Sequence, residues 1–495
     1  MDSPATQHEH NTSGKDRVSV REQIGLGFGR AVQDGTHGSL FVLASPIYNI
    51  TLGLDARLLS TFVFVQRIWD ALLNPVFGQF SDNFRSRWGR RRPLIFLGAF
   101  PVAFFFGLLW WFPRNASHTF LFWYLLLISL AFYAGLSLFA MPLGGLIIEA
   151  TDDYHERTRV AGITLAFGFA AQIGSNWLFK LTQLWVPHGA PPSVRIADTI
   201  TGVRWVGIVS AILFLVMGLV PVALCRERNY AKVTSRQRPV PFLESLRAVR
   251  GNQSFMSLLW ARCLFSFGYQ MVGLMGGYMN IYYVFGGDIS GSATVGAILG
   301  SGYHIAAIAA SLFAYPHIER RVGKRRTLEL AAAILIVDCV SKYFLYQPGH
   351  PWMPIAIIMM NGISNAGVSL MAIAMLGDIA DQDEYLFGLR REGVFNSLLN
   401  WFEKAGSSLG SFMTGFLLSW IGFNPALGAQ STHTLHWMKA SYITFPALGA
   451  VMTLILVTRY NLSQDEVYKI KNELVRRRAA VAAADAADVA GAAPA

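Results

Sequence analysis

The chain has 495 residues, of which 53% are hydrophobic and only 14% are charged. A soluble globular protein carries about 25% charged residues, so this composition argues against that class and predicts a polytopic membrane protein. The formal net charge of +11 does not indicate a nucleic-acid partner, because the basic residues occupy loops that alternate with long apolar runs.

Twelve apolar stretches are long enough to cross a lipid bilayer, since a span needs about 20 apolar residues. They cover residues 25–53, 59–81, 93–113, 119–149, 159–186, 202–224, 255–285, 293–315, 327–346, 353–377, 392–421 and 438–458. The predicted fold class is therefore an all-α integral membrane protein. The polar residues 1–24 lack the apolar run of a cleavable signal peptide and are expected to form a cytoplasmic tail.

The loops after the even-numbered spans hold most of the basic residues. The loops on the opposite side hold little beyond Arg57, Arg114 and Arg195. Because loops rich in Lys and Arg stay in the cytoplasm, this asymmetry predicts that both termini are cytoplasmic.

The chain also consists of two related halves. The basic turn Arg87–Arg92 after the second span recurs as Arg321–Arg326 after the eighth. Such repeats predict two bundles of six helices around a central cavity. We expect an N-terminal bundle over residues 25–224, a cytoplasmic linker over 225–254, a C-terminal bundle over 255–458 and a cytoplasmic, partly disordered tail over 459–495.

Charged residues inside the second span are candidates for function. Arg67, Asp70 and Asn74 are spaced i, i+3 and i+7, so they share one face of a helix. Ionisable groups are costly inside a bilayer and often mark ion pathways. These residues either form a structural ion pair between helices or bind a cation or proton.

Two further spans carry polar residues that we expect to bind substrate. In the first span, Asp34 either accepts hydrogen bonds from sugar hydroxyls or is simply solvated near the cytoplasmic mouth. His37 is either a proton relay or a structural polar residue. In the fifth span, Gln172, Asn176 and Trp177 lie on or beside a polar stripe. Such a stripe faces a substrate pathway or joins two helices.

The second half carries a matching stripe. Asn396, Asn400 and Lys404 are spaced i, i+4 and i+8 in the eleventh span, with Trp401 beside them. Weaker cavity candidates are Asn361 and Asn365 in the tenth span and Arg262 in the seventh. Glu403 is expected to point away from the face of Lys404, and Asp338 and Lys342 are expected to form an i, i+4 pair of modest value.

Charged residues at the cytoplasmic ends of the spans predict a gate. The expected ion-pair networks contain acidic and basic residues from both halves: Asp82, Arg90, Arg91, Asp378, Asp381, Glu384 and Arg391. Breaking and remaking such networks would accompany rocking of one bundle on the other. The same basic residues also serve as topology signals.

Several of these motifs together resemble a known family. Gly78 and Asp82, followed by Gly89–Arg92, are similar to the cytoplasmic signature of the major facilitator superfamily. Arg67–Pro75, Asp152–Arg159 and Asp378–Tyr385 resemble the glycoside–pentoside–hexuronide:cation symporters, the family of the bacterial melibiose symporter. This resemblance runs from about residue 25 to about residue 458.

The resemblance implies a twelve-span major facilitator fold in a cell inner (plasma) membrane. It implies a sugar site at Asp34, a cation-site carboxylate at Asp70 and a lysine at Lys404 that links the two sites. Asn74 stands where the family has a second carboxylate, which favours H⁺ over Na⁺ because less negative charge remains to hold a desolvated sodium ion.

The function that follows is secondary active, cation-coupled symport of a sugar or glycoside by alternating access. We expect no enzymatic activity, no metal site, no cofactor beyond the coupling ion, and a monomer whose partners are the solute and the lipid bilayer. The alternatives are a transporter of a lipid-like or other non-sugar solute and a non-transporting membrane sensor. An integral-membrane enzyme is disfavoured, since no hydrolase or metalloprotease motif occurs.

Overall fold

The computed structural model describes most of the chain between residues 17 and 462. The described residues are 17–86, 89–114, 116–148, 150, 154–187, 191–225, 227, 251–387, 392–425, 427, 429–462, 466–467, 469–470, 472–474 and 476. They form helices joined by short loops, and none of these residues lies in a strand. The predicted disorder of the last residues of the chain falls outside the described part.

The helices divide into two compact units. The first unit takes in the described residues within Met1–Leu54 and Trp69–Gln237, and the second takes in those within Asp55–Ile68 and Arg238–Ala495. The division passes through one helix, α2, so the two parts of α2 are described with different units.

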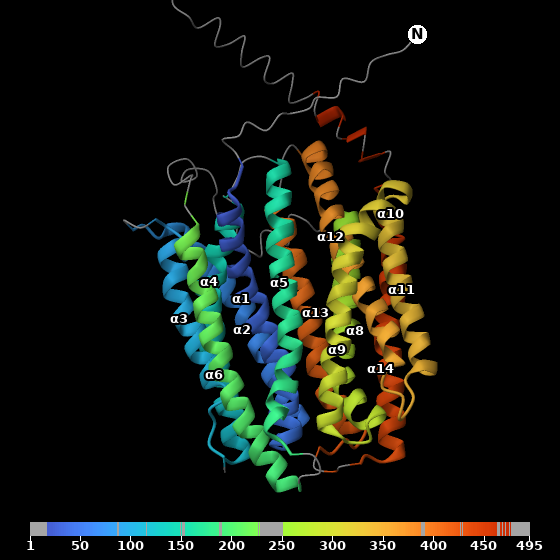
Figure 1. Ribbon diagram of the computed structural model, residues 1–495. Coiled ribbons are helices and arrows are strands. Elements are labelled where there is room, and N and C mark those ends of the chain that lie inside the picture. Colours follow the sequence, from blue (N-terminus) through green and yellow to red (C-terminus); the bar gives the residue numbers. More distant parts are fainter. Residues whose placement is uncertain are drawn as a thin grey trace, which may run out of the picture. The chain divides into compact units, whose positions relative to one another are not determined.

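The first unit is built from long helices and two short irregular ones (Figure 1). Its elements are α1 (Val20–Ala44), the π-helix η1 (Ser45–Thr51), the later part of α2 (Ala56–Asn83), α3 (Arg92–Leu108), α4 (His118–Ile148), α5 (Tyr154–Thr182), the 3₁₀-helix η2 (Gln183–Trp185) and α6 (Pro192–Leu224). Helix α1 packs on α5 and α6, and α3 packs on α4 and α6.

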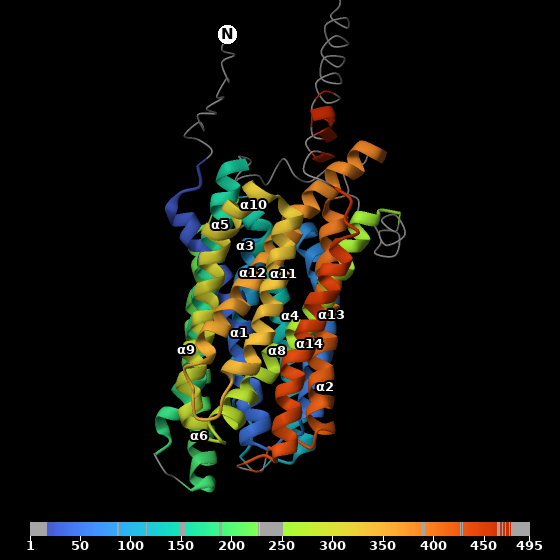
Figure 2. The same cartoon turned by 90° about the vertical axis from the view of Figure 1, so that its right-hand side faces the viewer.

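The second unit has a comparable arrangement (Figure 2). Its elements are the start of α2, α8 (Gln253–Tyr278), the π-helix η3 (Met279–Val284), α9 (Ile289–Ala309), the π-helix η4 (Ala310–Ala314), α10 (Tyr315–Val322), α11 (Lys324–Leu345), α12 (Pro354–Phe387), α13 (Glu392–Trp420) and α14 (Thr432–Val457). Helix α8 packs on α13 and α14, while α12 packs on α9 and α11.

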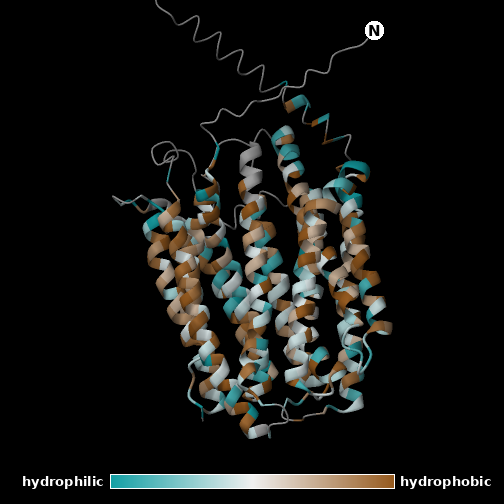
Figure 3. Cartoon of the chain, in the orientation of Figure 1, coloured by the Kyte–Doolittle hydropathy of each residue, from teal (hydrophilic) through white to brown (hydrophobic). Residues whose placement is uncertain are grey.

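Each of the twelve predicted spans coincides with a helical stretch of the described chain. By length and composition, the described helices that could cross a membrane are His118–Ile147, Ser193–Leu224, Ile289–Val322, Pro354–Leu386 and Thr432–Val457. Apolar residues cover much of the helices in both units (Figure 3). Helices α1, α2 and α13 carry several charged residues, among them Asp34, Asp70 and Lys404.

The first helix begins earlier than its apolar residues suggest. Ser19 Oγ accepts a hydrogen bond from the Glu22 main-chain N–H at 3.3 Å, and the Glu22 carboxylate accepts one from Ser19 N at 3.4 Å. This reciprocal capping box satisfies main-chain donors that would otherwise lack partners at a helix start. The Ser-x-x-Glu spacing therefore extends α1 to Val20.

Helices α1 and α8 each run directly into a π-helical turn. In η1 the buried Asn49 donates from Nδ2 to the Leu54 carbonyl at 2.5 Å, and in η3 the buried Asn280 donates to the Ser292 carbonyl at 3.1 Å. A side-chain amide thus joins each turn to the residues that follow. Such π-helical turns are uncommon and frequent at functional sites.

Helices α8 and α13 approach each other closely at two glycines. A Cβ atom built on Gly406 would overlap the carbonyl oxygen of Cys263, and one built on Gly410 would overlap that of Phe267. Only glycine leaves room for a main-chain carbonyl at this spacing. Small residues at i and i+4 on one helix are a common way to bring membrane helices together.

Candidate functional site

The predicted sugar carboxylate, Asp34, lies where α1 packs on α5. Its Oδ2 accepts a hydrogen bond from Arg30 Nε at 2.7 Å, and the Asp34 side chain is 17% exposed. A Cβ atom at Gly168 on α5 would overlap Asp34 Oδ2, so this glycine makes room for the carboxylate. Arg30 was missed by the sequence analysis, although its position four residues before Asp34 on a helix was a usable signal.

His37 lies one turn further along α1 and faces α4. Its Nδ1 is 3.0 Å from the Tyr133 hydroxyl, and the two rings meet edge to face. On the neighbouring face of α1, Ser39 Oγ donates to Ser175 Oγ on α5 at 3.0 Å. Polar contacts therefore join the predicted site residues of α1 to both α4 and α5.

The predicted stripe on α5 runs beside this surface. The Gln172 and Ser175 side chains lie next to Gly38 of α1. The Asn176 Nδ2 is buried without a hydrogen-bond partner among the described residues. Trp177 is 38% exposed. The stripe thus combines an amide at the α1 interface with an indole on the surface.

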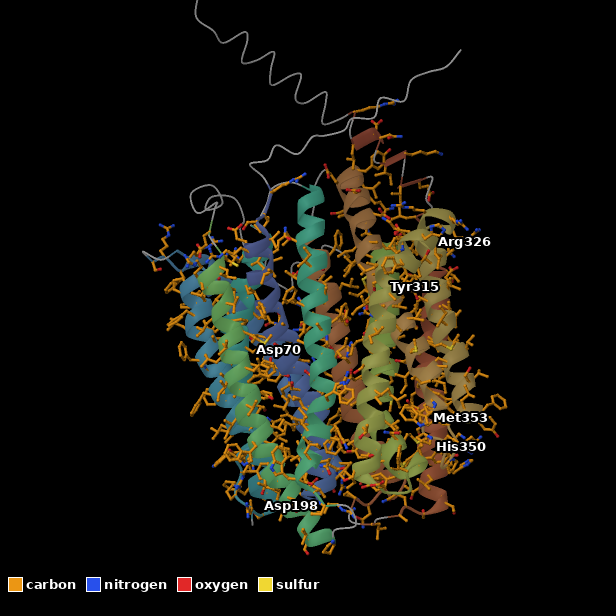
Figure 4. All side chains as sticks on the ribbon, viewed as in Figure 1. Asp70, Asp198, Tyr315, Arg326, His350 and Met353 are labelled. Atoms are coloured by element: carbon orange, nitrogen blue, oxygen red, sulfur yellow. The ribbon has the colours of Figure 1, made fainter. Side chains whose placement is uncertain are left out.

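The α2 residues sit near the middle of that helix, where Figure 4 labels Asp70. Arg67, Asp70 and Asn74 are all partly buried. Ser137 Oγ on α4 donates to Asn74 Oδ1 at 3.3 Å, so the amide in the family's second carboxylate position is already engaged with α4.

The two α12 residues belong to a buried polar network in the second unit. Asn361 Nδ2 donates to Asp338 Oδ2 on α11 at 3.2 Å. Asn365 Nδ2 donates to the Tyr303 hydroxyl on α9 at 2.8 Å, and Tyr303 also accepts a bond from the Tyr269 hydroxyl on α8 at 2.6 Å. The network joins α8, α9, α11 and α12.

The expected Asp338–Lys342 pair is present at the end of this network. Lys342 Nζ lies 2.7 Å from Asp338 Oδ2, and the two side chains are 1% and 0% exposed. Lys342 Nζ also lies 4.6 Å from the centre of the Tyr442 ring on α14. Its complete burial distinguishes this pair from the exposed i, i+4 pairs of modest value.

The α13 stripe is exposed along part of its length. Asn400 Nδ2 donates to Asn396 Oδ1 at 3.2 Å, and Trp401 is 41% exposed. Lys404 is partly buried, and its carbonyl accepts hydrogen bonds from the Ser407 and Ser408 hydroxyls.

Beside Lys404 lies an ion pair that the sequence analysis did not expect. The Arg262 guanidinium on α8 makes two hydrogen bonds to the Glu403 carboxylate, from Nε at 3.1 Å and from Nη2 at 2.5 Å. The residues are far apart in the sequence, so no local spacing could have signalled the pair.

One of the predicted gate regions is built around a main-chain anion site. The N–H groups of Arg90, Arg91 and Arg92, at the start of α3, all donate to the Glu227 carboxylate at 2.8 Å. Gly89, at φ +106°, turns the chain into this arrangement, and a Cβ there would meet the Glu227 side chain. The side chain of Asp82 lies outside the described residues.

In the second gate region, Asp378 pairs with Lys324, a residue that the sequence analysis did not assign to the gate. Lys324 Nζ at the start of α11 lies 2.7 Å from Asp378 Oδ2 on α12, and it also donates to the Ala374 carbonyl at 3.2 Å. Asp381 and Glu384 are partly buried on the last turns of α12. Arg391, their predicted partner, lies outside the described residues.

These observations define a class of protein. Two helical units contain charged pairs inside apolar helices, and no group of three or more His, Cys, Asp or Glu side chains in the described residues could hold a metal ion. The fold is similar to that of a variant of the nucleoside transporter NupG, with a TM-score of 0.65 and 11% identity over 89% of this chain and 100% of that chain. This likeness shows a shared all-helical fold.

The family profile described as MFS/sugar transport protein matches residues 27–464, so the chain belongs to this family. It is 24% identical to the isoprimeverose transporter of Lactiplantibacillus pentosus over 85% of this chain and 84% of that protein. It is 24% identical to the glucuronide carrier protein homolog of Escherichia coli over 93% of this chain and 97% of that protein. The resemblance to the symporter family is confirmed, and the protein is a multi-pass membrane transporter, not an enzyme.

Proposed function

We propose that this protein is a secondary active transporter that carries a sugar or glycoside together with a cation by alternating access. The similarity to the isoprimeverose transporter and the glucuronide carrier homolog, over at least 85% of this chain in each case, carries the proposal. The ion gradient supplies the driving force, because a bound cation and a bound sugar each shift the equilibrium between the two access states.

The coupling ion is a proton. Asp70 is the carboxylate of the coupling site, with Arg67 and Asn74 on the same face of α2 and Lys404 as the linking lysine. The amide of Asn74 accepts a hydrogen bond from Ser137, so that position contributes no negative charge for a desolvated sodium ion. A single carboxylate can still load and release a proton.

In the first unit, Asp34 and the polar residues of α1 and α5 are assigned to sugar binding, and in the second unit the polar residues of α12 and α13 are assigned to it. The remaining residues assigned to it are His37, Gln172, Asn176, Trp177, Asn361, Asn365, Asn396, Asn400 and Trp401. The Arg30–Asp34 pair supports this assignment, because a carboxylate already held by one donor is positioned to accept further hydrogen bonds from adjacent hydroxyls. Asp82, Arg90, Arg91, Asp378, Asp381, Glu384 and Arg391 form the cytoplasmic gate.

The protein resides in the cell inner (plasma) membrane as a monomer with both termini cytoplasmic. In the second unit, Arg326 lies at one end, and His350 and Met353 lie at the opposite end (Figure 4). Arg320, Arg321, Lys324 and Arg325 lie at or beside the junction of α10 and α11, near Arg326 in the chain. The positive-inside rule supports a cytoplasmic location for that end.

Transport by purified protein in proteoliposomes tests the proposal. Labelled methyl glycosides would be offered under an acid-outside gradient and, separately, under an inward sodium gradient. We expect accumulation with the proton gradient alone. Absence of gradient-driven accumulation of every glycoside would refute sugar symport, and accumulation driven by sodium alone would refute proton coupling.

Two matched α2 variants test the coupling role. Asp70→Asn should abolish accumulation while labelled sugar still exchanges across the membrane in counterflow. Asn74→Asp restores the second carboxylate and should introduce sodium-dependent uptake. Normal accumulation by Asp70→Asn would remove this carboxylate from the coupling site.

A further inference from the structure

The two side chains of the Arg262–Glu403 ion pair differ strongly in their exposure to solvent. The Arg262 side chain is 6% exposed, whereas the Glu403 side chain is 36% exposed. The buried guanidinium is held by the carboxylate through two hydrogen bonds and by the Ser369 hydroxyl on α12 at 2.9 Å. The carboxylate is therefore the accessible partner of a buried cation.

The Arg262 guanidinium has an unused hydrogen-bond donor. Its Nη1 is buried without a hydrogen-bond partner among the described residues. An arginine presents a planar fork of donors that matches a carboxylate in two-point contact. Arg262 can therefore hold a second carboxylate in the same manner if Glu403 moves away.

The accessible face of α13 leads to this pair. Asn396, Asn400 and Glu403 are spaced i, i+4 and i+7, so they follow one face of the helix. Both asparagines are exposed and joined by a hydrogen bond. A polar solute that contacts the two amides would have the Glu403 carboxylate as its next neighbour along the helix.

We propose that Arg262 and Glu403 form an exchange site, in which the carboxylate of an acidic sugar replaces Glu403 on Arg262 and Glu403 takes up a proton. This inference rests on the proposed sugar symport and narrows its substrate to a sugar that bears a carboxylate. It also adds a proton-carrying residue on α13 to the one proposed on α2.

The charges decide between an acidic and a neutral sugar. In the empty site the Arg262 cation and the Glu403 anion sum to zero. After an acidic sugar and a proton bind, the site holds the Arg262 cation, the sugar carboxylate and a neutral Glu403, and the sum is still zero. A neutral sugar with the same proton would leave Arg262 as a buried cation without a counter-charge, which is costly.

Binding of the sugar and of the proton therefore favour each other. The sugar carboxylate releases Glu403 from Arg262, and a carboxylate without its cationic partner holds a proton more tightly. By thermodynamic reciprocity, protonation of Glu403 makes Arg262 available to the sugar.

Among the described residues, three other titratable groups lie close to the pair. Cys263 on α8 and Lys404 on α13 are the chain neighbours of Arg262 and Glu403, and Tyr303 on α9 interacts electrostatically with Arg262 while its hydroxyl accepts a hydrogen bond from Tyr269. Helix α12 contributes the hydroxyl of Ser369 and the amide of Asn365. Glu403 is the carboxylate in contact with Arg262, so the proposal assigns the proton to it.

The test uses two sugars that differ at one carbon. Methyl β-D-glucuronide and methyl β-D-glucoside share their ring hydroxyls, but only the first carries a carboxylate. In proteoliposomes with an acid-outside gradient, we expect the full-length protein to take up the glucuronide at least tenfold faster than the glucoside. Glucoside uptake equal to or faster than glucuronide uptake would overturn the inference while leaving sugar symport in place.

Variants of Arg262 and Glu403 distinguish the proposed substrate-exchange role from a purely structural contact between α8 and α13. Arg262→Gln should reduce glucuronide uptake at least tenfold and remove the preference between the two sugars. Glu403→Gln should make glucuronide exchange independent of pH between pH 5 and pH 8. If either variant reduces both sugars equally and keeps the wild-type pH profile, the pair only fastens α8 to α13 and the inference fails.

Arg325→Gln is the matched control, because it removes an arginine from the exposed Arg325–Glu329 pair in the same unit. It should keep both the sugar preference and the pH profile. The size-exclusion profile of each variant would be compared with that of the wild type, and only variants with a wild-type profile would be used in the transport assay. Absence of uptake of both sugars by the wild-type protein would refute the proposed symport itself.

Discussion

The buried pair of Asp338 and Lys342 leads to a quantitative prediction about single and double variants. Lys342→Met removes the cation and leaves the Asp338 carboxylate buried, whereas Asp338→Leu leaves the ammonium buried. The double variant removes both charges and replaces them with apolar side chains of similar volume. We expect each single variant to be much less stable than the wild type and the double variant to be close to it.

The magnitude follows from the burial of both groups. Removing one member of a fully buried ion pair costs about 3–5 kcal/mol, because the remaining charge has no partner and no water. Replacing both members is often neutral, so the double variant should lie within about 1–2 kcal/mol, a cost that includes the lost hydrogen bond from Asn361. The Arg325–Glu329 pair has side chains 40% and 31% exposed, and breaking it should cost about 0–1 kcal/mol.

Thermal unfolding of the purified protein in detergent provides the assay. For a unit of roughly 200 residues, 1 kcal/mol corresponds to about 2–4 °C, so each single variant should lower Tm by about 6–20 °C. The double variant should recover most of that loss. Additive losses in the double variant would refute the reasoning, because they would mean that the two charges do not compensate each other.

Three smaller changes test other contacts. Glu227→Gln removes a charge held by three main-chain N–H groups and should destabilise the protein by about 1.5–3 kcal/mol in the same melting assay, whereas an unchanged Tm would show that these contacts contribute nothing. Gly168→Ala displaces the Asp34 carboxylate and should weaken sugar binding by roughly tenfold to a hundredfold in calorimetric titration, and unaltered affinity would remove Asp34 from the sugar site. The hydrogen bond from Arg57 lowers the pKa of Asp55 below its ordinary value of 3.8, so this carboxylate stabilises the folded protein above that pH. The stability deficit of Asp55→Asn at pH 7 should therefore shrink as the pH falls below about 4, and a deficit that persists in acid would contradict this assignment.

Much of the fold was predictable because membrane helices leave long apolar runs in the sequence. The ends were less predictable. Helix α12 continues to Phe387 through the polar residues after Leu376, which fall outside an apolar window. Helix α6 begins at Pro192, a residue suited to the first turn of a helix, well before its apolar run. The π-helical turns carry no simple periodic signal.

The candidate site was predictable where partners lie on one helix. The Asp338–Lys342 pair followed from its i, i+4 spacing, but its burial depends on Tyr442 and Asn361 from other helices. The partners of Glu403 and Glu227 come from segments more than 130 positions away. Sequence spacing holds no information about such contacts, so the sequence analysis identified the polar residues of the stripes but not the ion pairs beside them.

The close contact of α8 and α13 at Gly406 and Gly410 has a mechanical consequence. Main-chain carbonyls fill the space where side chains would otherwise allow slippage, so the two helices resist sliding and should move as one rigid body. Any tilt during transport would then carry Arg262 and Glu403 together and leave their separation nearly constant. Movement of the helices alone would not separate the pair, and a competing ion would be needed to do so.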